Sequence, residues 1–240
     1  MQQALGERTL RFSKKRFGRF SPETEQPARE AVCARSEAVK ELLISFRRLA
    51  SGAQGACHRD YELAKRLAGR VGYSKDDVLG LSVALAGEED RRGFIRLAGL
   101  FLSACVQTGR ESVYTINTRG FSRPLEELGF WNRKTIIIDG PSGDRAGRLA
   151  RKGSLLVLRE GAGDNIGQDM TGGTIIAEAG AGAMIGHSMK NGLIIVKGNA
   201  GRLAGFDMQG GEIRLEGSCG SISSTVLSGR ITHLGVLLVE

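Results

Sequence analysis

The chain has 240 residues, of which 41% are hydrophobic, and it carries a formal net charge of +8. This length can hold one large or two small domains. The longest apolar stretch, residues 94–106, contains Arg96 and is too short to cross a bilayer, and the N-terminus lacks the apolar segment of a signal peptide. We therefore expect a cytoplasmic protein that does not enter a membrane.

Glycine content and charge divide the chain into two parts. Of the 35 glycines, 22 lie from residue 135 onward, and residues 135–240 contain ten basic and ten acidic residues. The excess of positive charge therefore belongs to residues 1–134. We expect a basic N-terminal arm over residues 1–26, a helical domain over 27–110 and a glycine-rich domain over 111–240.

The N-terminal arm interleaves cations with aromatic rings between Arg8 and Phe20. Such a segment can bind nucleic acid through phosphate contacts and base stacking. It can equally lay its phenylalanines on the protein's own surface and leave its charges in water. The residues that would make either contact are Arg11, Phe12, Lys14, Lys15, Arg16 and Phe17.

The next segment, residues 27–108, has the apolar periodicity of helices. Between Pro27 and Leu49 apolar residues recur mostly at spacings of three, four and seven, which marks one face of a helix. Further helices fit residues 60–70, 74–86 and 88–106. Ser74 and Asp77 predict a capping box at the start of the third helix. Because that helix is apolar, we do not expect it to read DNA as part of a helix-turn-helix.

A short lead-in separates the helices from the glycine-rich repeats. Residues 113–118 alternate like a strand, and residues 134–140 return to that pattern. Between them, Ser122 and Pro124 are typical of a helix start, which predicts a short helix over residues 122–127.

From residue 143 to 229 the sequence repeats itself. Read in register, the copies are GDRAGRLARKGSLLV, GDNIGQDMTGGTIIA, GAMIGHSMKNGLIIV, GRLAGFDMQGGEIRL and GSISSTVLSGRITHL. Their first glycines lie at positions 143, 163, 182, 201 and 220, so the first step is longer by a single residue than the equal steps that follow. Each copy has glycines at its bends and a short β-branched run, which predicts a solenoid with a strand in each coil.

Stacked coils place equivalent residues in columns about 4.8 Å apart. A column expected inside the coil is Ile175, Ile194 and Ile213. A column expected in solvent, as a ladder of alternating charge, is Glu178, Lys197 and Glu216.

Two further apolar columns must lie either on the outer face or in the core of the solenoid. Leu156, Ile176 and Ile195 would face outward, and we expect the helical half to cover them. Met170, Met189, Met208 and Leu227 form a stripe that could attract a soft metal, but the leucine in the last copy favours core filling.

The sequence GDNIGQDMTGGTIIAEAGAGAMIGHSMKNGLIIVKGNAG resembles the GXGXG repeat domain. That domain forms the C-terminal region of glutamate synthase large subunits and one of the component chains of formylmethanofuran dehydrogenase. The resemblance covers residues 113–235 and implies a right-handed parallel β-helix. It also implies a structural module in a complex whose catalysis is carried elsewhere.

The chain departs from these relatives where their chemistry would lie. It begins Met1-Gln2-Gln3, without the N-terminal nucleophilic cysteine of the glutaminase reaction. Its cysteines, at positions 33, 57, 105 and 219, form no iron–sulfur or zinc pattern, and no flavin or molybdopterin motif is present. We therefore expect the β-helix without the activities, and no cofactor or metal site.

His187 is the strongest catalytic candidate among the three histidines, His58, His187 and His233. It adjoins Ser188, and Asp169 and Asp207 are expected on adjacent coils. Its own column contains glutamine, phenylalanine and threonine, so no ligand or catalytic type recurs there. We interpret His187 as a bend residue and retain an enzyme site near it, between the two halves, as an alternative.

These observations predict an α+β multidomain protein, with an N-terminal helical domain followed by a single-stranded right-handed parallel β-helix. The function that we expect is that of a non-catalytic scaffold or accessory subunit of a larger complex, redox or glutamate synthase-like, bound to a protein partner or to itself. Nucleic-acid binding through the basic arm is a second hypothesis, and no membrane partner is expected.

Overall fold

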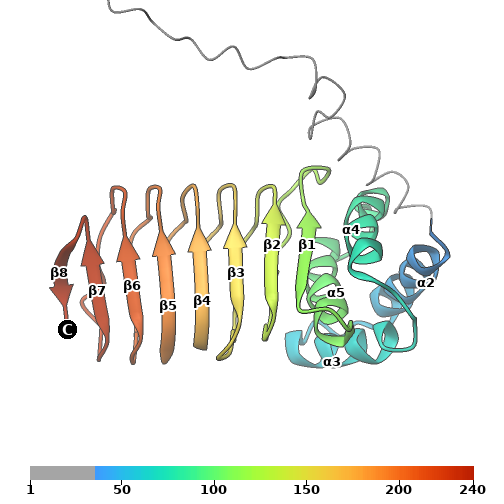
Figure 1. The fold of residues 1–240 in the computed structure, drawn as a ribbon, viewed down its shortest axis with the longest axis horizontal. Coiled ribbons are helices and arrows are strands. Elements are labelled where there is room, and N and C mark those ends of the chain that lie inside the picture. Colours follow the sequence, from blue (N-terminus) through green and yellow to red (C-terminus); the bar gives the residue numbers. More distant parts are fainter. Residues whose placement is uncertain (1–35) are drawn as a thin grey trace, which may run out of the picture.

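A computed structural model describes residues 36–240 of the chain (Figure 1). The helices are α2 (Glu37–Gly52), α3 (Cys57–Ala68), α4 (Lys75–Ala84) and α5 (Phe94–Thr108), with a 3₁₀ turn, η1 (Leu85–Glu88), between the last two. The strands are β1 (Val113–Asn117), β2 (Thr135–Asp139), β3 (Leu155–Leu158), β4 (Thr171–Ala177), β5 (Asn191–Val196), β6 (Glu212–Leu215), β7 (Arg230–His233) and β8 (Val236–Val239).

The strands form one sheet in chain order, parallel from β1 to β7 and antiparallel between β7 and β8. The chain therefore winds as a parallel β-helix of about six turns, as the repeats predict (Figure 1). Positions 113, 135, 155, 174, 193, 212 and 230 are equivalent in successive coils. The coils thus shorten from the first to the third, keep one length through the middle of the rod, and lose a further residue in the last.

In two of the repeats, the first glycine makes room for a carboxylate from the coil before. A Cβ on Gly163 would lie 2.3 Å from Asp144 Oδ1, and one on Gly182 would lie 2.0 Å from Asp164 Oδ1. These two oxygens accept hydrogen bonds from the backbone N–H groups of Asp164, at 2.9 Å, and of Ala183, at 2.7 Å. The recurring Gly-Asp pair thus ties one coil to the next.

The lead-in is wound like the repeats, so the short helix expected over residues 122–127 is wrong. In a typical bend Asn165, Gly167 and Asp169 have positive φ values of 59°, 68° and 54°. Glu127, Gly129 and Trp131 follow the same alternation at 60°, 73° and 54°. The local cap signal of Ser122 is outweighed because this segment bridges to the next coil through Leu125 and Ser142. The β-helix therefore starts at β1, one coil before the first recognisable repeat.

The isoleucine column and the three methionines lie in the core, as the sequence predicts. The side chains of Ile175, Ile194 and Ile213 are fully buried inside the coil. Met170, Met189 and Met208 are also fully buried, which confirms that they fill the core.

The helices begin at local cap signals. At α4 the predicted capping box is confirmed, because Ser74 Oγ accepts from the Asp77 N–H at 3.2 Å and Asp77 Oδ2 accepts from the Ser74 N–H at 2.9 Å. Ser36 caps α2 by accepting from the Val39 N–H at 3.1 Å. The last helix starts later than residue 88, because Gly93 adopts a φ of 72° and α5 begins after it.

The helices close the β1 end of the solenoid (Figure 1). Ser82 Oγ on α4 accepts from the Asn117 N–H at 3.0 Å and so takes a hydrogen bond from the first strand. On α5, a Cβ at Gly99 would lie 1.7 Å from the Glu126 carbonyl oxygen, so only glycine permits this approach. Ser103 Oγ accepts from the Gly129 N–H at 2.9 Å and is enclosed in the contact.

Candidate interaction surfaces

The outer sheet face carries the apolar stripe that the sequence indicates, but with different members. Leu156 pairs with Ile175 and is only 1% exposed, so its predicted outward position is wrong. The extra residue of the longer first step lies just before β3, and an alignment on the first glycines therefore shifts Leu156 to the wrong face. Val157 is the residue in register with Ile176 and Ile195.

Six aliphatic side chains on four adjacent strands are half-buried on this face. They are Ile137, Leu155, Val157, Ile176, Leu193 and Ile195, here called the outer stripe. No helix among residues 36–240 lies over the stripe, so the expectation that the helical half covers it is wrong within the described chain (Figure 1). Instead, α4 packs against β1, and Gly99 and Ser103 let α5 approach the first bend closely.

A ladder of alternating charge borders the outer stripe. Its members occupy the position after the last core residue of the strand in successive coils: Asp139, Arg159, Glu178, Lys197 and Glu216. Arg159 Nη1 lies 3.6 Å from Asp139 Oδ1, and Lys197 Nζ lies 3.8 Å from Glu178 Oε1. The predicted ladder therefore exists and extends further toward the helices. Asp139 is buried, whereas the Lys197–Glu178 pair is exposed, and exposed pairs contribute little to stability. The four exposed members therefore mainly give this border a defined charge pattern.

The opposite end of the solenoid from the helices exposes five large aliphatic side chains. They are Leu227 (73% exposed), Leu234 (64%), Val236 (61%), Leu237 (45%) and Leu238 (48%), here called the C-terminal patch. The expectation that Leu227 extends the methionine column into the core is therefore wrong. The last coil is shorter than the one before it, so Val226 takes the place below Met208 and Leu227 moves one position outward.

A buried carboxylate lies between the first two bends. Glu127 is 1% exposed, and its Oε1 accepts from Arg145 Nε and from Arg148 Nη1, both at 2.8 Å. Burial, followed by the charge of Glu127, raises the pKa of the nearby Cys57 thiol to about 11. A thiol with a raised pKa is a poor nucleophile at neutral pH. The cluster therefore joins the helical cap to the coils and does not form an activated cysteine site.

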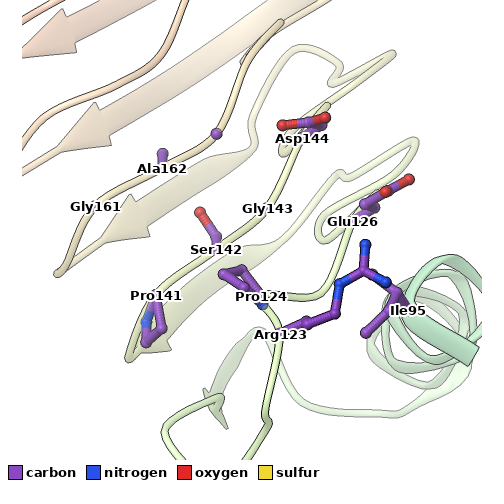
Figure 2. A pocket seen from close by; sticks show the side chains of 11 residues that line it. Ile95, Arg123, Pro124, Glu126, Pro141, Ser142, Gly143, Asp144, Gly161 and Ala162 are labelled. Atoms are coloured by element: carbon purple, nitrogen blue, oxygen red, sulfur yellow. The ribbon is translucent and has the colours of Figure 1, made fainter. Parts of the chain in front are cut away.

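A groove of about 380 Å³ lies beside the first bends, and Figure 2 shows the side chains along it. Ser142 lines this groove and is 3% exposed, and its hydroxyl has no hydrogen-bond partner within the described residues. A serine nucleophile needs a base within hydrogen-bond reach, and none is in place at Ser142 among residues 36–240. Arg123 is exposed at the groove. Asp144 also lines it, but its Oδ1 accepts a hydrogen bond from the Asp164 N–H. Among residues 36–240, the groove therefore presents a buried serine hydroxyl without a base beside it.

His187 is half-buried on the bend side of the solenoid. Its Nδ1 lies 3.2 Å from Asn165 Oδ1, and its ring meets that of Phe206 edge-on at a centroid distance of 5.2 Å. Asp169 meets His187 through the backbone, because its N–H donates to the His187 carbonyl oxygen at 2.9 Å. An amide partner orients the imidazole but supplies no charge for acid–base work. The enzyme hypothesis near His187 thus stays a prediction.

The six residues of the predicted basic arm, and Cys33, lie outside the described residues. Within residues 36–240, no group of three or more histidine, cysteine, aspartate or glutamate side chains is placed to hold a metal ion. None of the helices in that range has the length and apolar character needed to cross a bilayer.

No family model, curated protein or solved structure matches this chain.

Proposed function

We propose that this chain is an interaction module that holds a partner protein on the outer stripe of its β-helix. The observation that supports this most directly is the continuous run of six half-buried aliphatic side chains on a rigid sheet, left open by the described helices. Apolar surface that is contiguous and bordered by polar residues is typical of protein-binding faces.

The neighbouring charge ladder gives such a partner an orientation. Its signs alternate over the exposed positions Arg159, Glu178, Lys197 and Glu216, so a partner with the complementary alternation fits in one register and meets like charges in a register shifted by one coil. A face of this design selects its partner by charge pattern while the aliphatic side chains supply the buried area.

The repeat pattern itself indicates the kind of assembly. Because it resembles the GXGXG domain, we propose right-handed winding and a place as an accessory subunit of a larger enzyme complex, redox or glutamate synthase-like. In this proposal the chain carries no catalytic activity of its own.

The experiment is affinity capture of the full chain from an extract of its source cells, followed by mass spectrometry. The test variant, Ile176→Lys with Ile195→Lys, places two charges in the outer stripe. The control, Gln209→Lys with Ser224→Lys, adds the same charges at exposed positions away from it. We expect wild type and control to recover the same partner and the test variant to lose it while keeping its circular dichroism spectrum. Recovery by all three proteins, or by none, contradicts the proposal.

Nucleic-acid binding is the second candidate function, supported by the concentration of the positive charge in residues 1–134. It predicts an affinity for RNA or DNA that falls steeply with salt and is abolished by deleting residues 1–20. Absence of any binding at low ionic strength removes this candidate.

A further inference from the structure

The far end of the solenoid is built differently from its middle. The chain reverses after β7 through a two-residue turn, Leu234-Gly235, whose φ values are 50° and 78°. Two successive positive φ values are those of the tight hairpin turn that best matches strand twist. Strand β8 thereby becomes the last strand of the sheet, at the end opposite the helices (Figure 1).

Two exposed rows that are mostly polar along the solenoid become leucine in this last coil. The Leu234 N–H donates to the Leu215 carbonyl oxygen as the Glu216 N–H does to Val196 one coil earlier, so Leu234 continues the charge ladder with an apolar side chain. Leu227 likewise follows the row Thr171, Lys190 and Gln209. The change from polar to apolar in both rows shows that this end differs in kind from the surface of the inner coils.

The edge of β8 also lacks most of the usual protection. The strand Val236–Val239 contains no charged residue and no proline. Its one protective feature is a register irregularity beside Ile231. Charges, prolines and covering segments are what keep exposed edges of soluble proteins from pairing. Within residues 36–240 no strand pairs with the outer edge of β8. Five of the seven exposed large aliphatic side chains of these residues belong to this one end.

We infer that a second copy of this chain occupies the C-terminal patch, with the two β8 strands paired antiparallel about a twofold axis. The strand is uncharged, so its self-pairing brings no like charges together, and its aliphatic side chains meet their own kind. Arg230 and Glu240, which form an ion pair at 2.7 Å, place both signs of charge beside the patch.

The closed helical end determines that the assembly stops at two copies. Stacking one solenoid head to tail on another would need a free β1 end, and that end is covered by α4 and α5. Only the C-terminal ends can therefore meet, and a tail-to-tail contact uses the same surface on both copies. The result is a dimer with one helical cap at each extremity and a sheet that continues through both chains.

The experiment is sedimentation velocity of the purified full chain over a wide range of concentrations. Leu237→Lys places a charge within β8, and Leu234→Asn replaces an apolar patch residue by the residue that this turn favours. The second variant should fold at least as well as wild type, which separates lost association from lost folding. The control is Ile44→Lys on α2, at a side chain that is 45% exposed, as Leu237 is.

We expect wild type and Ile44→Lys to sediment as dimers. Both patch variants should raise the dissociation constant by roughly 100-fold or more, as for residues central to an interface. Hydrogen exchange should show that the β8 amides on the edge away from β7 are protected in the dimer and unprotected in Leu237→Lys. A wild-type monomer at every concentration overturns the inference, as does a dimer that both patch variants leave intact or an open-ended series of larger oligomers. None of these results depends on a partner at the outer stripe, so the two proposals fail separately.

Discussion

Replacing Gly99 by alanine tests whether α5 truly rests backbone against backbone on the first coil. In an isolated helix this change is stabilising by about 1 kcal/mol, because alanine is the better helix former. Here the new Cβ would lie 1.7 Å from the Glu126 carbonyl oxygen, and no rotamer change can relieve a contact with backbone. The helix has to move away from the coil by a distance that disrupts its hydrogen bonds.

The size of the effect follows from the contacts that would be lost. Overpacking of this kind costs about 1–3 kcal/mol. The bonds from the Glu126 N–H to the Ile95 carbonyl oxygen, at 3.3 Å, and from the Gly129 N–H to Ser103 Oγ, at 2.9 Å, contribute about 1 kcal/mol each. After subtraction of the helix-propensity gain, we expect a net destabilisation of roughly 2–4 kcal/mol. For a chain of this size that lowers the melting temperature by about 5–15 °C.

The assay is thermal and urea unfolding followed by circular dichroism, with Gly52→Ala as the control. A Cβ at Gly52, the last residue of α2, would meet Leu63 Cδ2 at an ordinary 3.4 Å, so this variant should be neutral or slightly stabilised. Hydrogen exchange should locate the loss in α5 and the first bend. If Gly99→Ala is as stable as wild type, the helical end is not packed as described and the argument that it blocks stacking also fails.

Three further predictions test the core, the junction and the helical layer. In urea titrations at concentrations where the chain is monomeric, Met189→Ala should lower the free energy of unfolding by about 2–5 kcal/mol, whereas Leu227→Ala should change it by less than about 0.5 kcal/mol; equal effects would restore Leu227 to the core. Because the pKa of Cys57 is raised to about 11, its alkylation in the native protein should be slow at neutral pH and accelerate toward that value, as followed by peptide mass spectrometry; fast labelling at neutral pH would contradict its burial. Hydrogen bonding from Arg47 lowers the pKa of Glu88 against the opposing effect of burial, so the ionised Glu88 side chain stabilises the fold above its unfolded pKa and stops doing so as pH falls through its folded pKa. Glu88→Gln should therefore lower the free energy of unfolding at neutral pH and differ less from wild type in acid. A difference in stability that grows in acid would refute the Arg47–Glu88 pair.

The architecture was predictable because glycine spacing reports coil length directly. Each first glycine accommodates a carboxylate or backbone of the coil before, so its recurrence is a physical requirement that the sequence displays. The capping box at Ser74 was predictable for the same reason, since its cause is local. The helix at residues 122–127 was not, because a Ser-Pro start looks the same whether the chain continues as a helix or bends into a coil that lies beside the next one.

The surfaces were harder to predict because they depend on register. Leu156 and Leu227 were each misplaced by a single residue, the first by an insertion before β3 and the second by a deletion before β7. In a strand one residue exchanges inside for outside, so a small error in the period changes which side chains are free to bind. The C-terminal patch could have been found from the run Val236–Val239, which is uncharged and directly follows a Leu-Gly turn. Alignment of the repeats misses this run because it lies after the last copy.

The graded coil lengths give the molecule an adjustable span. The coils that begin at positions 155, 174 and 193 are equal in length and alike in their bend geometry, whereas the longer first coil and the shorter last one belong to the ends. Removal or duplication of one middle coil should therefore shorten or lengthen the rod by about 4.8 Å and leave both ends intact. The number of middle coils therefore sets the distance between the helical cap and the C-terminal patch.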